Sequence, residues 1–340
     1  MELKRDSLID TAKGIGIIAV VIGHIIFNII QKIVYTFHLP LFFILSGYFF
    51  CDYCSFDKFL LKKSKSYLIP YAFFSSIIIL FDYWLYGFDP AHLIFDLRSF
   101  IMQRRFKTLW FLTTLYLCSL IYYIIFKLFS GNIKGITITV IIFSTLFILY
   151  DQISNYPLIW NLDTAFISIF FYHFGYLLKK HNMIEKIKNQ TPLTRFLYLI
   201  LLVGICAFCS ILNYFLCGIT FEMFYNQYGV FPLTVAAACT GSLAVLFLSS
   251  FLTSFSFLQW LGRNSIVFFA LHQSVALPLS DMICRYIPYF SHIQNTFSRV
   301  LRTSFTFVCI FVLCFIFHSI IMKANLGFMI GKSKSKTNLR

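Results

Sequence analysis

Four polar or ionisable residues recur inside the first apolar stretch of the sequence. The segment LIDTAKGIGIIAVVIGHIIFN contains Asp10, Lys13, His24 and Asn28 among aliphatic residues. On an α-helix, Lys13 and His24 are about three turns apart, so they point the same way and lie roughly 16 Å apart along the axis. Asp10 and Asn28 fall within about 40° of the same stripe. Because ionisable groups are costly against lipid, the stripe should face protein or a water-filled cavity.

His24 has the side chain best suited to chemistry in this stretch. A histidine takes or gives a proton near neutral pH, which suits general-base work. The alternative is a structural histidine that is hydrogen-bonded to a neighbouring helix. Asp10 lies too far along the helix to contact His24. Any carboxylate that orients His24 must therefore come from another helix, and Asp163 and Glu222 are the candidates.

The next motif, FHLPLFFILSGYFF, provides a second histidine. We expect His38 to begin the second span, near its outer end, after a short turn that makes the first two helices antiparallel neighbours. Gly47, deeper in this span, would permit close helix packing. His38 is either part of a substrate site or an interfacial cap.

Two groups of cations could attract anionic substrates. Lys62 and Lys65 precede the third apolar run on the expected inner side, where they either signal topology or attract the phosphates of coenzyme A. Arg104 and Arg105 lie in the expected outer segment 89–107, against the usual charge bias. That segment is either an interfacial helix on anionic lipid or a lid that contacts an anionic acceptor, such as a lipid-linked phosphosugar.

Two further motifs contribute candidate residues. Trp110 lies in LWFL at the start of the fourth span, where an aromatic belt would also place a tryptophan. His272 ends WLGRNSIVFFALHQ, well inside an apolar run, and is a second intramembrane histidine. The ten cysteines include two CxxC pairs in or beside apolar runs, without a histidine cluster at metal spacing. Neither a zinc site nor a disulfide framework is therefore predicted.

Composition shows what kind of scaffold positions these residues. The chain has 340 residues, of which 59% are hydrophobic and only 12% charged, whereas soluble domains average about 25% charged residues. Several uncharged runs reach the roughly 20 residues that cross a bilayer. We predict an all-α polytopic membrane protein with an integral domain at 1–322 and a short basic cytoplasmic tail at 323–340. Ten spans are expected, at 14–34, 38–53, 67–87, 108–129, 135–151, 163–179, 195–216, 230–251, 264–283 and 299–321.

The distribution of positive charge gives the orientation. With the N-terminus inside, 20 of the 28 Lys and Arg residues fall on inner segments. This asymmetry predicts that both termini are cytoplasmic. The net charge of +15 therefore reflects topology, and no nucleic-acid partner is predicted.

In this order, the motifs resemble those of membrane acyltransferase family 3, and within it the fucose 4-O-acetylase-like acetyltransferases. The resemblance rests on DTAKGIGIIAVVIGH, FHLPLFFILSGYFF, the basic run ending in LIPY, LWFL and LGRNSIVFFALHQ. It covers the chain from Asp10 to about His272. The first two motifs together are specific, whereas LWFL alone is weak.

The resemblance implies a ten-helix enzyme of the bacterial cytoplasmic (inner) membrane. Such enzymes take an acyl group, usually acetyl, from acetyl-CoA on the cytoplasmic side and pass it to a hydroxyl of an exported or lipid-linked glycan. Acetyl-CoA is a co-substrate, and no bound cofactor is implied. His24 matches the family's presumed catalytic residue. Lys13 stands where the family often has arginine, which keeps the charge but loses the bidentate fork, and Lys62 and Lys65 correspond to a pair that is commonly arginine.

The predicted catalytic residue is His24, and the predicted acyl-CoA- or substrate-binding residues are Asp10, Lys13, His38, Lys62, Lys65, Arg104, Arg105, Trp110 and His272. His24 either removes the proton of an acceptor hydroxyl or transiently carries the acyl group itself. The rival function is a glycan flippase or solute transporter, although the two related halves with broken helices typical of many transporters are not found. The acceptor sugar, the acyl group and the oligomeric state stay open.

Overall fold

The computed structural model describes residues 6–26, 28–51, 55–154, 156–291 and 295–331. Helices dominate these ranges, which contain no extended strand beyond an isolated bridge between Glu222 and Gln227. Lys4, Arg5 and the part of the predicted basic tail from residue 332 onward lie outside the described residues. The prediction of an all-α polytopic membrane protein is confirmed.

Nine helical stretches within the described ranges are long and apolar enough to cross a membrane. They are α1 (Ser7–Ile25), α2 (Ile29–Tyr48), α3 (Phe56–Tyr86), Pro90–Leu128 containing α4 (Pro90–Met102) and α5 (Trp110–Leu128), α6 (Ile133–Ser154), α9 (Pro192–Cys217), α10 (Phe231–Phe251), Ser265–Arg285 containing α12 (Ser265–Leu271) and α13 (Leu277–Arg285), and α15 (Thr296–Lys323). The expected span at 163–179 is also helical, as α7 (Leu162–Lys180). It carries Asp163, Lys179 and Lys180 and is not among the nine.

The reversal between the first two helices comes earlier than the sequence predicted. Asn28 begins α2 as its N-cap, and its side chain accepts a hydrogen bond from the Ile30 N–H at 2.8 Å. Asparagine is among the best N-cap residues, because its side chain satisfies a backbone donor of the first turn. The expected spans at 14–34 and 38–53 are therefore wrong in their boundaries. Asn28 does not extend the polar stripe of α1, and His38 lies within α2 rather than at its start.

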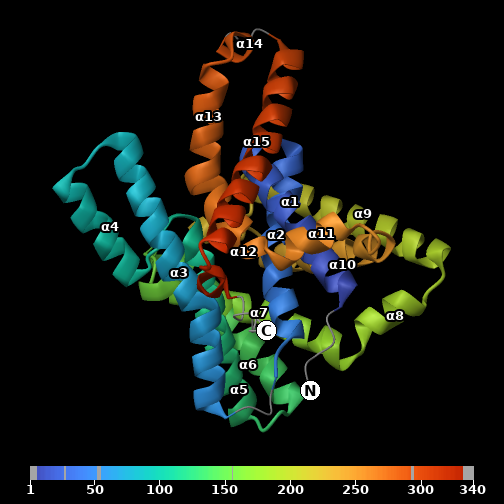
Figure 1. The fold of residues 1–340 in the computed structure, drawn as a ribbon. Helices are drawn as coiled ribbons and strands as arrows, with labels where there is room; N and C mark the ends of the chain where they lie inside the picture. The colour runs from blue at the N-terminus through green and yellow to red at the C-terminus, as the bar shows by residue number, and fades with distance from the viewer. Residues whose placement is uncertain (1–5, 27, 52–54, 155, 292–294, 332–340) are drawn as a thin grey trace, which may run out of the picture. The chain divides into compact units, whose positions relative to one another are not determined.

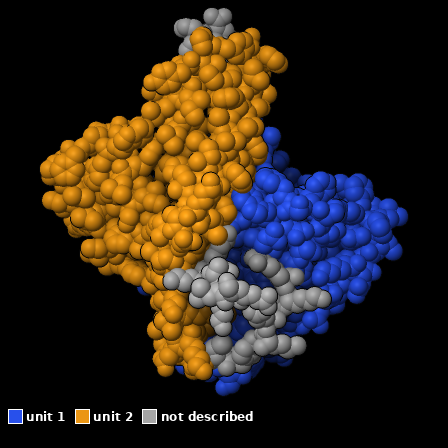
Figure 2. All heavy atoms as spheres, in the orientation of Figure 1, with its two compact units in different colours: residues 1–53, 117–158, 162–265 blue, residues 54–116, 159–161, 266–340 orange. Residues whose placement is uncertain are grey.

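The described chain forms two compact units (Figure 2). Unit 1 comprises residues 1–53, 117–158 and 162–265. Within it, α1 packs against α2, α10 and α11 (Ser256–Arg263), while α2 also packs against α7 and α9 (Figure 1). The predicted close packing at Gly47 is confirmed, because a Cβ there would collide with the backbone oxygen of Tyr172 on α7. Gly175 on α7 meets the backbone oxygen of Ile44 on α2 in the same way, so the two helices touch backbone to backbone.

Unit 2 comprises residues 54–116, 159–161 and 266–340. Its helices α13 and α15 run side by side and are joined through α14 (Pro288–Ser291) (Figure 1). The five-residue π-helix η4 (His272–Ala276) separates α12 from α13. After α15, the short helix η5 (Gly327–Ile330) packs against α3.

Candidate active site

His24 lies in the last turn of α1, where it meets Tyr35 of α2. The Tyr35 hydroxyl is 3.3 Å from His24 Nδ1. Tyr35 also contacts His38, and the centroids of these two rings are 5.0 Å apart. His24 is half-buried, whereas Tyr35 and His38 are buried. The structure thus brings two predicted site residues together around a tyrosine that the sequence analysis did not single out.

The proton on neutral His38 can be placed from its hydrogen bond. Its Nδ1 lies 2.9 Å from the backbone oxygen of Val34. Because a carbonyl oxygen only accepts hydrogen bonds, Nδ1 carries the proton and Nε2 keeps its lone pair. His38 lies in the middle of α2 and not at a helix end, and its role stays a prediction.

Lys13 and Asp10 lie toward the opposite end of α1 from His24. The Lys13 ammonium is 5.1 Å from the centroid of the Phe49 ring, which follows α2. Asp10 is buried where α11 crosses α1, since a Cβ at Gly262 would collide with the Asp10 backbone oxygen. Eleven residues of helix separate Lys13 from His24 by roughly 16 Å, so α1 keeps the two groups apart.

The two carboxylates that could orient His24 differ in their surroundings. Asp163 is fully buried, and its Oδ2 accepts a hydrogen bond from Asn226 Nδ2 at 2.8 Å. It thereby ties the segment after α9 to the start of α7. Glu222 belongs to the same segment and interacts electrostatically with Tyr35. Burial raises the pKa of the Glu222 carboxyl above its ordinary value.

His173 on α7 shows what a purely structural histidine looks like in this fold. Its Nδ1 is 2.9 Å from the Tyr122 hydroxyl and its Nε2 is 2.9 Å from Thr137 Oγ1. The Thr137 hydroxyl donates to the Ile133 backbone oxygen at 2.8 Å. Thr137 must therefore accept from Nε2–H, and Tyr122 donates to Nδ1. Both ring nitrogens are used inside the helix bundle.

In unit 2, a strained basic segment precedes α5. Gln103, Arg105 and Lys107 have left-handed backbone φ angles of 56°, 53° and 48°. Trp160 and Asn161 are left-handed as well, with φ angles of 59° and 52°. Non-glycine residues rarely adopt this conformation, and it persists where the surroundings over-determine it.

Asn161 is the residue that ties these two strained segments together. It is fully buried, and its Oδ1 accepts from the Arg105 backbone N–H at 2.9 Å. Its Nδ2 donates to the Trp110 backbone oxygen at 3.4 Å and to Thr113 Oγ1 at 3.3 Å. The amide side chain therefore fixes the backbone that carries Arg105 and begins α5.

The remaining charges near this segment have distinct surroundings. Lys107 Nζ lies 2.9 Å from Asp82 Oδ2 on α3, so this cation serves an ion pair within unit 2. Arg104 and Arg105 are half-buried. The preceding helix α4 has its apolar side chains outward, with Ile94, Phe95 and Ile101 each more than 60% exposed, whereas Asp96 is buried. Such an outer face suits contact with lipid, as expected for an interfacial helix.

His272 and Trp110 lie in segments that touch each other in unit 2. Thr108 Oγ1 donates to the Ala270 backbone oxygen at 3.1 Å, which joins the turn just before α5 to the end of α12. His272 begins the π-helix η4, and its Nδ1 is 2.8 Å from the Phe269 backbone oxygen, so that nitrogen carries the proton. π-helical turns occur frequently at functional sites. Both His272 and Trp110 are buried.

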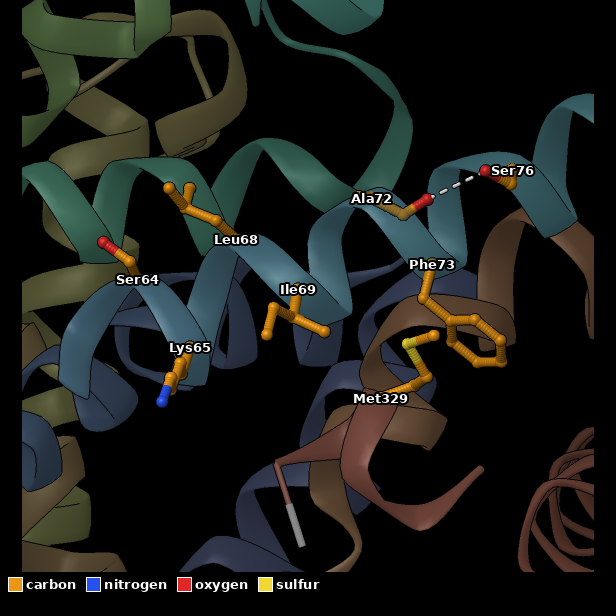
Figure 3. A pocket seen from close by; sticks show the side chains of 8 residues that line it. All are labelled: Ser64, Lys65, Leu68, Ile69, Ala72, Phe73, Ser76 and Met329. Atoms are coloured by element: carbon orange, nitrogen blue, oxygen red, sulfur yellow. Dashed lines mark hydrogen bonds between the residues drawn. The ribbon is translucent and has the colours of Figure 1, made fainter. Parts of the chain in front are cut away.

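Lys65 lines an open groove of about 550 Å³ along α3 (Figure 3). The other lining residues are mostly apolar or small: Ser64, Leu68, Ile69, Ala72, Phe73, Ser76 and Met329. Lys65 supplies the charged group among them, and Met329 of η5 lies beside Phe73 at the opposite end (Figure 3). Lys62 is exposed one turn earlier on α3 and does not line the groove.

A family model described as an acyltransferase domain matches residues 6–319, from the N-cap of α1 into α15. The chain belongs to the acyltransferase 3 family. No curated protein and no solved structure matches it. The family assignment made from the motifs is confirmed, and the protein is a multi-pass membrane acyltransferase. The roles of the individual site residues stay predictions.

Proposed function

We propose that this acyltransferase moves an acyl group, acetyl in the simplest case, from cytoplasmic acyl-CoA to a hydroxyl of a cell-surface or lipid-linked glycan, with His24 as the general base. The observation that carries the proposal is the placement of His24. It is a half-buried imidazole next to the Tyr35 hydroxyl in the last turn of α1, in a chain that matches an acyltransferase domain over residues 6–319. The enzyme would work in the bacterial inner membrane.

The proposed transfer needs one proton to move twice. His24 takes the proton of the acceptor hydroxyl while the hydroxyl oxygen attacks the thioester carbonyl carbon. A C–O ester bond forms and the C–S bond breaks. The departing coenzyme A thiolate then receives the proton from His24, which returns the imidazole to its starting state.

Two features support a donor that approaches from the cytoplasmic side. Lys13 lies roughly 16 Å along α1 from His24, at the end predicted to be cytoplasmic. Lys65 lines one end of the groove on α3, and the rest of that groove is mostly apolar (Figure 3). An ammonium group beside an apolar groove suits a phosphate that is joined to a longer, less polar chain, as in acyl-CoA.

The strained segment 103–107 supports an anionic acceptor. Arginine is well suited to binding phosphate, because its guanidinium donates two parallel hydrogen bonds. Arg104 and Arg105 provide two such groups on a backbone that Asn161 holds in place, next to the buried Trp110. A phosphate of a lipid-linked sugar is the ligand that we propose for them.

The test uses membranes from cells that produce the enzyme and contain its natural acceptor. Radiolabelled acetyl-CoA is added, and label in the glycan or lipid-linked fraction is counted per unit of enzyme. We expect His24→Ala to lower incorporation at least a hundredfold, in line with the usual size of general-base effects. His181→Ala, which removes an exposed histidine after α7, is the matched control and should behave as wild type. Normal incorporation by His24→Ala would refute the proposal.

The same assay separates the enzyme from the transporter alternative. A flippase would carry no label from acetyl-CoA to the glycan and would not need acetyl-CoA. NMR spectra of the glycan with and without the gene would then identify the acyl group and the hydroxyl that receives it.

A further inference from the structure

We infer that Tyr35 is a positioning residue for His24, and that it fixes Nε2 as the nitrogen that reacts. This inference rests on the proposed function, because it assigns a partner to the proposed base. From the sequence, the candidates for this role were the carboxylates Asp163 and Glu222. The structure instead places a tyrosine hydroxyl 3.3 Å from His24 Nδ1.

The surroundings of Tyr35 hold its hydroxyl at that nitrogen. The rings of Tyr35 and His24 meet edge to face, with centroids 5.8 Å apart and planes at 85°. The Tyr35 ring also packs against the His38 ring. Gln31 Nε2 donates to the Gly23 backbone oxygen at 3.0 Å, which ties the first turn of α2 to the end of α1. Catalytic hydrogen bonds that are long in a ligand-free enzyme commonly tighten once substrate binds.

The hydrogen-bonding capacity of a phenol fits this role. A base must present a lone pair to the substrate, so the other imidazole nitrogen must carry the proton. If the Tyr35 oxygen accepts from Nδ1–H, the lone pair resides on Nε2. When Nε2 takes the substrate proton, the Tyr35 oxygen keeps its bond to Nδ1–H and stabilises the imidazolium. The same nitrogen would react if His24 carried the acyl group.

The choice of a hydroxyl also suits the low polarity of this helix pair. A carboxylate beside His24 would need further donors to offset its desolvation, whereas a neutral phenol costs much less to bury. Glu222 interacts with Tyr35 from the segment after α9, and when ionised it would favour positive charge at this end of the pair.

The chain contains a matched internal control. Tyr122 and His173 form the same type of pair, with the hydroxyl 2.9 Å from Nδ1. In that pair the direction is reversed, because Thr137 accepts from Nε2–H and Tyr122 must donate to Nδ1. The two tyrosines therefore offer one chemical change, loss of a hydroxyl, at a positioning site and at a structural site.

The experiment compares Tyr35→Phe with Tyr122→Phe in membranes supplied with radiolabelled acetyl-CoA. Rates are expressed per folded enzyme, which is quantified by size-exclusion chromatography in detergent. We expect Tyr35→Phe to lower kcat about tenfold or more, as loss of a hydrogen bond to a charged group does, with an unchanged KM for acetyl-CoA. The acid-side midpoint of its rate–pH profile should move to lower pH, because the imidazolium has lost an acceptor. Tyr122→Phe should change neither the rate per folded enzyme nor the midpoint.

Three outcomes overturn the inference. One is a Tyr35→Phe variant with wild-type kcat and midpoint. The second is a reduced rate without a shift of the midpoint, which would show that Tyr35 only packs. The third is an equal effect of Tyr122→Phe. If His24→Ala is inactive in the same membranes, the proposed function survives these results, whereas an active His24→Ala variant overturns both.

Discussion

Two substitutions at Asn161 separate the stability that its side-chain hydrogen bonds provide from the stability that its left-handed backbone costs. Asn161→Gly deletes three hydrogen bonds of a fully buried amide but keeps a residue that adopts the left-handed backbone without strain. At about 0.5–1.5 kcal/mol for each bond, the loss of the three bonds should lower the unfolding free energy by about 1.5–4.5 kcal/mol. Asn161→Ala loses the same bonds and should be about 1–2 kcal/mol less stable than Asn161→Gly, because a Cβ is strained in the left-handed region.

Thermal unfolding of the purified variants in one detergent measures both contributions. The melting temperatures should fall in the order wild type, Asn161→Gly, Asn161→Ala. Acetyl-CoA binding by the folded fraction should be retained, because the donor is proposed to bind elsewhere. An alanine variant as stable as the glycine variant would refute the strain argument. Wild-type stability of both variants would refute the role of Asn161 as the tie between the two segments.

Three further predictions concern packing, donor binding and charge. Gly47→Ala should destabilise the protein by about 1–3 kcal/mol, because the added Cβ would collide with the backbone of α7. Gly204→Ala should not, since a Cβ there meets nothing within 4 Å. Thermal unfolding of the two variants compares them. Lys65→Glu should raise the KM for acetyl-CoA about tenfold in the membrane assay, as expected when a charged contact to phosphate is lost. Burial lowers the pKa of Lys188, but its hydrogen bonds to Asp6 and a neighbouring carboxylate outweigh this and raise the pKa above 10.5. Lys188→Met should therefore cost less than about 1 kcal/mol near neutral pH, because the ion pair is partly exposed. This difference should vanish as the pH rises through the raised pKa of Lys188, where the folded protein also loses the proton.

Each of these predictions has an outcome that would contradict it. Equal melting temperatures for the two alanine variants would mean that α2 and α7 separate at little cost. Lys58→Glu is the control for donor binding, because Lys58 lies on α3 outside the groove. An equal change in KM for both lysine variants would indicate general surface charge rather than a site. A destabilisation by Lys188→Met that persists at high pH would show that packing, not charge, is responsible.

Hydropathy predicted most of the membrane helices because burial in lipid needs long uncharged runs, and those runs are visible in the sequence. It misplaced the first reversal, since apolar residues continue on both sides of Asn28 and conceal the turn. The N-cap preference of asparagine was the signal that could have located it. That error moved His38 from the start of α2 to its interior.

The motifs pointed to His24 as the candidate catalytic residue, but they did not indicate which residues contact it. Tyr35 is one of 20 tyrosines, and nothing in its spacing distinguishes it from the others until α1 and α2 are placed together. Asn161 lies 56 positions from Arg105, and contacts between such distant segments leave no periodic pattern in one sequence. Local physics thus predicts the helices and proposes candidate reactive side chains, whereas the neighbours of those side chains are set by tertiary packing.

The reciprocal glycine contact between α2 and α7 has a consequence for motion during turnover. Two helices that meet backbone to backbone at Gly47 and Gly175 cannot slide past each other without separating. Tyr35 and His38 belong to α2, so we expect them to stay in place relative to α7 while substrates enter and leave. Hydrogen exchange during turnover should therefore find slow amides along the α2–α7 contact.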